Sequence, residues 1–197
     1  MGGYDRGLGA AGAFFTFLIT LSLEQIVSAT DNSVDSYFYQ NRWLLFWIGA
    51  LLFLRYLLGS AVHLWHEYAK TETARDASAF QRDLYFLLAF GALSITACYQ
   101  ATVIAFLLWL LGLVASAGLW ALFNKIKQPK SPWNYWIWIN LAQAALLLAG
   151  ALLIRYRTID VQVFGSDRSL WLIMVLIGGA ICLVWDVRGQ VRNLNSA

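Results

Sequence analysis

The chain has 197 residues, of which 60% are hydrophobic, 16% aromatic and only 13% charged, with a formal net charge of +3. A soluble domain usually carries about 25% charged residues, so this composition excludes a water-soluble enzyme and a disordered protein. The two cysteines are too few for a disulfide framework or a cysteine-based zinc site. The composition therefore indicates a membrane protein with several transmembrane helices and little outside the bilayer.

Several segments are apolar enough for a transmembrane helix, which needs about 20 mainly apolar residues. The first runs from about Gly7 to Val27 and resembles a signal peptide, but we expect it to be a membrane helix. The second runs from about Trp43 to Trp65. The fifth runs from about Pro132 to Ile154, and the sixth from about Leu170 to Trp185.

The segment between them, residues 84–123, is an uncharged stretch of 40 residues without proline. As one helix it would be about 60 Å long, roughly twice the hydrocarbon thickness of a bilayer. We therefore predict a turn at its clearest polar break, residues 98–102, which gives a third span over 84–98 and a fourth over 102–123. A single helix here would leave the chain with five spans.

Positive charge favours six spans, because cytoplasmic loops carry an excess of Lys and Arg. With six spans and both termini inside, nine of these residues lie on the cytoplasmic side and four outside, against seven and six for five spans. We therefore predict an all-α, polytopic transmembrane helix bundle. Residues 1–197 form a single domain in this prediction, and both termini are cytoplasmic.

A charged residue lies deep in the second predicted span. Arg55 is close to the bilayer centre, where insertion scales assign a cost of roughly 2.5–3.5 kcal/mol. Helical geometry places His63 and His66 near the same side of that helix, with Gly59 beside them and Val62 interrupting the stripe. We expect this polar face to be buried against other helices or to line water.

Candidate partners for Arg55 follow from depth in the membrane. Gln143, with Asn140 nearby, lies about as deep in the fifth span as Arg55 does in the second. Glu24 in the first span is about 12 Å further out, but it is one of few strongly polar residues there. Two interpretations stay open: these groups hold helices together by hydrogen bonds, or they line an ion, proton or substrate path.

The two histidines also suggest a metal site. His63 and His66 are three residues apart and could both reach one ion, for which Asp186 at the inner end of the last span is the candidate third ligand. We favour the interpretation that the histidines lie beside lipid head groups and that the protein has no metal or other cofactor. A histidine pH switch is the other alternative.

Small residues spaced four apart predict close contacts between helices, within one bundle or in a homo-oligomer. These pairs are Gly9 and Ala13, Gly112 and Ser116, and Ala145 and Ala149, and the run Gly178–Ala180 has the same character.

In size and in its lack of soluble parts, the chain resembles small bacterial inner-membrane proteins that act as oligomeric channels or as membrane-damaging effectors. The resemblance implies a place in the inner (plasma) membrane. We predict a homo-oligomeric channel, pore-like or effector protein with a polar seam around Arg55. The alternatives are an accessory or scaffold subunit of a larger membrane complex, and a membrane-embedded enzyme that acts on a lipid or quinone with His63 and His66; we favour a non-enzymatic role. The bilayer is the expected partner, and we expect no nucleic acid, because the basic cluster at 125–130 is best explained as a topology signal.

Overall fold

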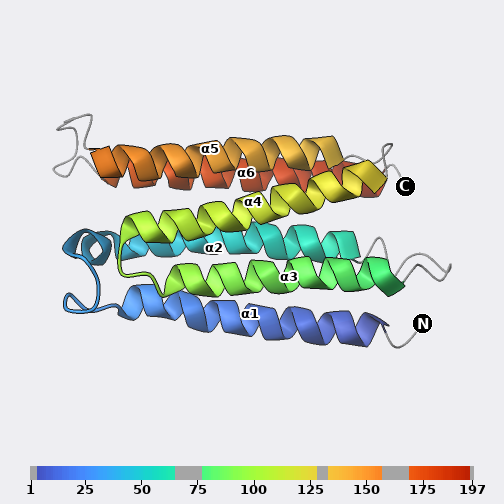
Figure 1. Cartoon of the computed structure of the whole chain (residues 1–197), viewed down its shortest axis with the longest axis horizontal. Coiled ribbons are helices and arrows are strands. Elements are labelled where there is room, and N and C mark those ends of the chain that lie inside the picture. Colours follow the sequence, from blue (N-terminus) through green and yellow to red (C-terminus); the bar gives the residue numbers. More distant parts are fainter. Residues whose placement is uncertain (1–3, 65–76, 128–132, 157–168, 196–197) are drawn as a thin grey trace.

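A computed structural model gives the fold as six helices that lie side by side along one long axis (Figure 1). The structure describes residues 4–64, 77–127, 133–156 and 169–195. The helices are α1 (Tyr4–Ser28), α2 (Ser36–Leu64), α3 (Ala77–Cys98), α4 (Val103–Lys127), α5 (Trp133–Tyr156) and α6 (Ser169–Asn195). The all-α prediction is confirmed for these residues.

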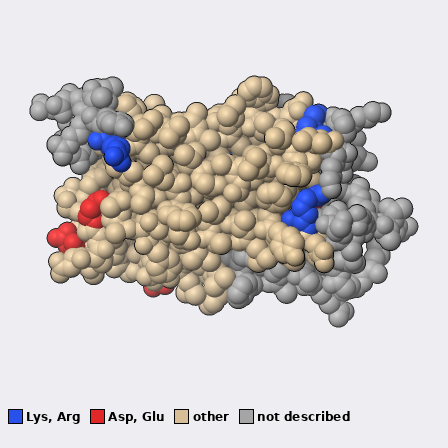
Figure 2. Space-filling view, in the orientation of Figure 1, with Lys and Arg blue, Asp and Glu red and all other residues tan. Residues whose placement is uncertain are grey.

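Four of these helices, α2, α4, α5 and α6, are long and apolar enough to cross a membrane. The surface agrees with this, because Lys and Arg lie near the two ends of the face shown in Figure 2 and the broad band between them holds none. Within such helices large apolar side chains point outward, for example Trp47 at 54% and Trp138 at 68% exposed. A surface of this kind suits lipid and not water. The chain is an integral membrane helical protein, and its six spans remain a prediction.

The long uncharged stretch folds back where the polar break predicted a turn. Helix α3 ends at Cys98 and α4 begins at Val103. The Thr102 hydroxyl accepts a hydrogen bond of 3.2 Å from the backbone N–H of Ala105, which caps the start of α4. Residues 84–123 therefore do not form the single long helix that the five-span alternative requires.

The helices extend beyond the predicted spans, because hydropathy marks the hydrocarbon core and a helix continues past it. The largest difference is in α6, which ends at Asn195 and not at Trp185. Helix α2 also begins earlier than predicted, at Ser36. Asp35 caps it, since its carboxylate accepts a hydrogen bond of 2.5 Å from the N–H of Phe38.

The six helices close into a ring. Helix α1 packs on α2 and α3, α2 packs on α6, α6 on α5, α5 on α4, and α4 on α3. Helix α1 begins and α6 ends at the same end of the bundle, which we call the terminal end (Figure 1). The α1–α2 connection and the α3–α4 turn lie at the opposite end, the loop end. Termini at one end are what an even number of crossings requires, and their cytoplasmic location remains a prediction.

The two connections at the loop end are joined to each other. The backbone N–H of Asp35 donates a hydrogen bond of 2.9 Å to the carbonyl of Ala101, in the α3–α4 turn. We call this bond the clasp. It holds the start of α2 beside the start of α4.

Candidate functional site

One face of α2 carries polar residues into the interior of the bundle. Arg55, Tyr56 and Ser60 are each at most 3% exposed, although α2 is otherwise apolar. His63, eight residues after Arg55, is half-buried further towards the terminal end. The helical repeat of 3.6 residues puts these positions on neighbouring parts of one side. Two residues of the expected polar face, Arg55 and His63, therefore point into the bundle, together with Tyr56 and Ser60, which were not predicted.

Arg55 forms a closed network with side chains of α5 and α6. Its Nε donates to Asp186 at 3.0 Å, and its Nη2 donates to Asn140 Oδ1 at 3.0 Å. Its Nη1 donates to Gln143 Oε1 and, at 3.2 Å, to the Tyr56 hydroxyl. That hydroxyl donates in turn to Asn140 Oδ1 at 2.8 Å. We call these five residues the central network.

Burial and aromatic rings complete the surroundings of Arg55. The side chains of Arg55 and Asp186 are each 1% exposed, so their opposite charges face each other away from solvent. The guanidinium carbon lies 5.0 Å from the centre of the Tyr56 ring and 5.8 Å from that of Trp136. Both rings lie within the range of a cation–π interaction. The guanidinium is thus paired in charge, hydrogen-bonded and flanked by aromatic faces.

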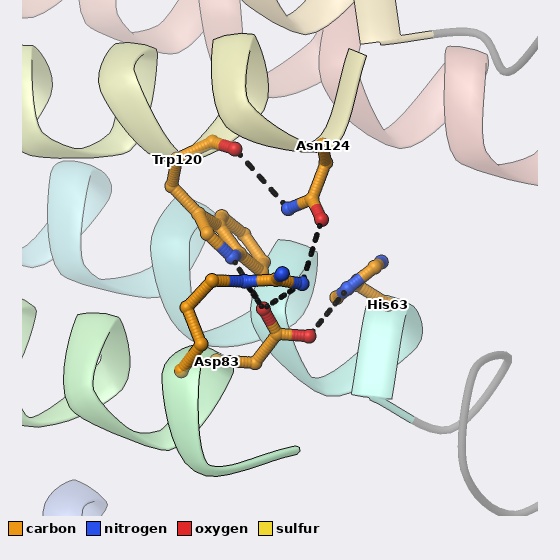
Figure 3. Close-up of polar contacts among 5 residues, drawn as sticks. His63, Asp83, Trp120 and Asn124 are labelled. Atoms are coloured by element: carbon orange, nitrogen blue, oxygen red, sulfur yellow. Dashed lines mark hydrogen bonds and ion pairs between the residues drawn. The ribbon is translucent and has the colours of Figure 1, made fainter. Parts of the chain in front are cut away.

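A second polar cluster lies nearer the terminal end, around Asp83 of α3 (Figure 3). The buried Asp83 carboxylate is 3.3 Å from His63 Nε2 and accepts a hydrogen bond of 3.0 Å from the Trp120 indole N–H. Arg82 donates to the same carboxylate at 3.3 Å and to Asn124 Oδ1 at 3.3 Å. The Asn124 amide donates to the Trp120 carbonyl at 3.1 Å. We call these five residues the end network.

Aromatic rings and a serine lie between the two networks. The Trp120 ring is 4.8 Å from His63 and 5.8 Å from Trp136, centre to centre, so the rings connect one network to the other. Ser60 lies on α2 between Tyr56 and His63. Ser60 Oγ and Asn140 Nδ2 are buried and have no hydrogen-bond partner among the described residues. We call Ser60 and the two networks together the seam.

On the loop-end side of Arg55 the interior is apolar. Leu45, Ile48, Leu52 and Phe53 of α2 are each at most 2% exposed, and Phe106 of α4 is fully buried among the same core. We call these five residues the apolar layer. The seam therefore extends from the terminal end to Arg55, and the apolar layer follows it.

The structure brings together some of the predicted site residues and separates others. Asn140 and Gln143 both contact Arg55, as their depth in the fifth span suggested. Glu24 is exposed on α1 and lies outside both networks. His66 lies outside the described residues.

The candidate metal ligands do not converge. His63 faces Asp83, whereas Asp186 faces Arg55, so the two belong to different networks. Within the described parts of the chain, no group of three or more His, Cys, Asp or Glu side chains is placed to hold a metal ion. Asp186 acts instead as the counter-charge of Arg55, a role that the sequence analysis did not assign to it.

Four members of the end network were not predicted as site residues: Asp83, Arg82, Trp120 and Asn124. Asp83 comes directly before the uncharged stretch, where a charge is most simply explained as the polar end of a span. Helix α3 begins at Ala77, six residues earlier, so Asp83 lies inside the helix and not at its end. Its inward direction depends on how α3 is rotated, which the sequence does not show. Trp120 and Asn124 are four apart and so share one face of α4.

Comparison of the chain with protein families, with characterised proteins and with solved structures found no match. The site must therefore be interpreted from its own chemistry.

Proposed function

We propose that this integral membrane protein moves protons across the bilayer through the seam inside its own bundle. The observation that carries the proposal is the burial of two acid–base pairs, Arg55–Asp186 and His63–Asp83, in the interior of an apolar bundle. Ionisable groups inside a membrane are costly, and they commonly mark ion routes and proton relays. The proposal narrows the predicted pore-like function to a path within one chain.

The chemistry of the seam favours protons over a larger solute. Its groups are carboxylates, an imidazole and the Tyr56 and Ser60 hydroxyls, which bind, release or relay protons. The side chains of the central network hydrogen-bond directly to one another at 2.8–3.2 Å, a spacing that leaves no gap for a solute between them. Ser60 Oγ and Asn140 Nδ2, both buried and without a described partner, are suited to bind water between the two networks.

The apolar layer acts as the gate in this proposal. Hydrophobic constrictions close channels because water leaves them, and protons then have no hydrogen-bonded route. Phe53 and Phe106 belong to this layer, each at most 2% exposed. The structure then represents a closed state, in which the seam is connected to the terminal end and the layer separates it from the loop end.

The proposal requires only one chain. All the hydrogen bonds of Arg55 described above come from its own bundle. A homo-oligomer, or a larger complex of which this chain is a subunit, would bring together several such paths without adding a group to any of them. The seam is therefore tested best in the purified protein alone.

The test is proton flux into liposomes that contain the purified protein. A potassium diffusion potential set by valinomycin drives protons inward, and a pH-sensitive dye inside reports their arrival. We expect flux in the parent protein and faster flux in Phe53→Ala, which thins the apolar layer. Arg55→Met combined with Asp186→Leu removes both charges of the central pair, and we expect its flux to fall to the rate of protein-free liposomes.

Ser22→Ala is the matched control. Ser22 is buried at 4% exposed, but it bonds to its own helix, at the Leu18 carbonyl, and is not part of the seam. It should conduct like the parent. A folded parent protein that conducts no faster than protein-free liposomes, with or without Phe53→Ala, would overturn the proposal. The networks would then hold helices together, as expected of an accessory or scaffold subunit.

A further inference from the structure

The end network places one titratable ring between the seam and the terminal end of the bundle. The His63 side chain is 12% exposed, whereas that of its partner Asp83 is 1% exposed. His63 Nε2 faces the carboxylate at 3.3 Å, and in Figure 3 the other ring nitrogen points away from Asp83. The imidazole therefore has one nitrogen on the seam and one directed away from it.

The carboxylate that faces this ring is held from two helices. Asp83 Oδ1 accepts from the Trp120 indole at 3.0 Å and from Arg82 at 3.3 Å, which leaves Oδ2 for His63. Arg82 is itself held by Asn124. The Trp120 ring also lies edge-on to the imidazole, with the two planes at 88°. The side chains around the ring thus fix its orientation from α3 and α4.

The charges near the ring balance in one protonation state. Arg82 neutralises Asp83, so the end network has no net charge when His63 is neutral and a charge of +1 when His63 is protonated. The charged groups that face the ring are therefore Asp83, which pairs with it, and Arg82, which pairs with the same carboxylate.

We propose that His63 is the group that exchanges protons between water at the terminal end and the seam, with Asp83 as its positioning partner. This inference rests on the proposed proton conduction. A proton from water forms a bond to Nδ1, and the Nε2–H bond then breaks as that proton passes to Asp83 Oδ2 or to a water that leads to Ser60. The ring is left neutral with its proton on Nδ1, and rotation of the ring about its Cβ–Cγ bond returns an N–H to the side that faces Asp83.

The test uses the same liposomes over a range of pH, in a protein whose other histidine is replaced. The chain has two histidines, so His66→Asn leaves His63 alone. We expect His66→Asn to conduct like the parent, and His63→Gln to conduct slowly with a flux that no longer changes with pH near neutrality. Added imidazole should restore flux to a His63→Gly variant, which a purely structural role of the ring would not allow.

Asp83→Asn tests the positioning role, since it keeps the shape of the side chain and removes its charge. We expect its flux to fall, because the ring loses the carboxylate that holds Nε2 towards the seam at 3.3 Å. Nitrogen-15 NMR of the single histidine should show a changed environment of Nε2 in this variant. This readout requires no flux.

The outcomes separate the two proposals. A His63→Gln protein that conducts like the parent with the same pH profile overturns the role of His63, while loss of flux in the Arg55 and Asp186 double variant would leave the proposed function standing. Absence of flux in the folded parent overturns both. Failure of imidazole to restore flux to a correctly folded His63→Gly protein also counts against His63.

Discussion

Arg55 donates hydrogen bonds to four side chains, and each bond removes part of the cost of placing a guanidinium in the bilayer. Asp186 supplies the opposite charge at 3.0 Å, and Asn140 and Gln143 supply neutral oxygen acceptors. Ion pairs in a low-dielectric interior are tolerated when their remaining hydrogen-bonding groups are also satisfied. The loss of one charge therefore costs more than the loss of both.

This asymmetry gives a prediction for stability. Asp186→Asn leaves the guanidinium buried without a counter-charge, and we expect it to lower the free energy of unfolding by about 3–5 kcal/mol. Arg55→Met combined with Asp186→Leu should recover most of that loss. Unfolding of the detergent-solubilised variants measures both effects. Equal or additive losses in the single and double variants would contradict the interpretation of the pair.

At the scale of residues, the depth of a residue in the membrane predicted the contacts of Arg55 better than its polarity did. Gln143 and Asn140 were predicted as partners of Arg55, because residues on two straight helices can meet when they lie equally deep in the membrane. Depth did not lead to Asp186, because the last span was expected to end at Trp185 and so placed Asp186 at the membrane surface. Nor did it lead to Asp83, whose inward direction depends on how α3 is rotated.

At the scale of helices, glycines set how closely α5 and α6 approach. A Cβ added to Gly150 would lie 2.8 Å from Val175 Cγ2, and one added to Gly178 would lie 2.2 Å from Leu146 Cδ2. The leucine end can rotate away, whereas a valine in a helix has one strongly preferred rotamer. The predicted run at Gly178 is therefore confirmed as a close contact, but Ala145 and Ala149 are exposed and do not form one within this chain.

Gly150 is a better position to test than Gly178, because Val175 cannot move away from an added methyl group as easily as Leu146 can. Gly150→Ala should lower the free energy of unfolding by about 1–3 kcal/mol, the usual cost of overpacking a tight interface. Gly12→Ala is the matched control, because nothing lies within 4 Å of the Cβ that it adds to α1. The control should be neutral or slightly stabilising, since alanine favours helix over glycine. If the two variants have the same free energy of unfolding in detergent, the close contact at Gly150 does not contribute to stability.

The existence of each helix could be predicted, but its length could not. The turn after Cys98 could be predicted from the length of the segment, because a single uncharged helix of 40 residues is too long for a bilayer. The extension of α6 to Asn195 could not be predicted, because the residues after Asp186 are polar enough to resemble a tail. Hydropathy predicts which part of a helix lies in the hydrocarbon core. The residues at which a helix begins and ends depend on capping and packing, which hydropathy does not describe.

At the scale of the whole molecule, the arrangement predicts which ends face which side. Both termini lie at the end opposite the acidic α1–α2 connection, which carries the exposed Asp31 and Asp35. The excess of Lys and Arg near the termini predicts that this end faces the cytoplasm. Ser33 is exposed in the connection and offers a labelling position at the opposite end.

Cysteine labelling of intact cells measures this orientation. Ser33→Cys should react with a membrane-impermeant maleimide added outside, whereas Ala197→Cys should react only after the membrane is opened. The native Cys98 and Cys182 are both buried, so their background labelling should be low. Labelling of Ala197→Cys from outside would reverse the predicted topology, and labelling of both positions from outside would exclude an even number of spans.

The order of helices around the ring could not be predicted. In water, the apolar stripe of a helix shows which side faces the core, but in lipid the outward side is apolar as well. The exposed Trp138 and the buried Trp136 on α5 illustrate this, since nothing in their composition separates them. Only the polar side chains indicate direction, and for that reason the meeting of Arg55 with Asn140 and Gln143 was the part of the interior that the sequence could locate.

The clasp between Asp35 and Ala101 joins the connection before α2 to the turn before α4. Arg55 lies on α2, whereas Asn140 and Gln143 lie on α5 and Asp186 lies on α6. The central network therefore ties three helices together around one buried pair of charges. In the proposed path, a proton on Asp186 would remove one of those two charges, so the ion that travels through the seam would also weaken the tie among these helices.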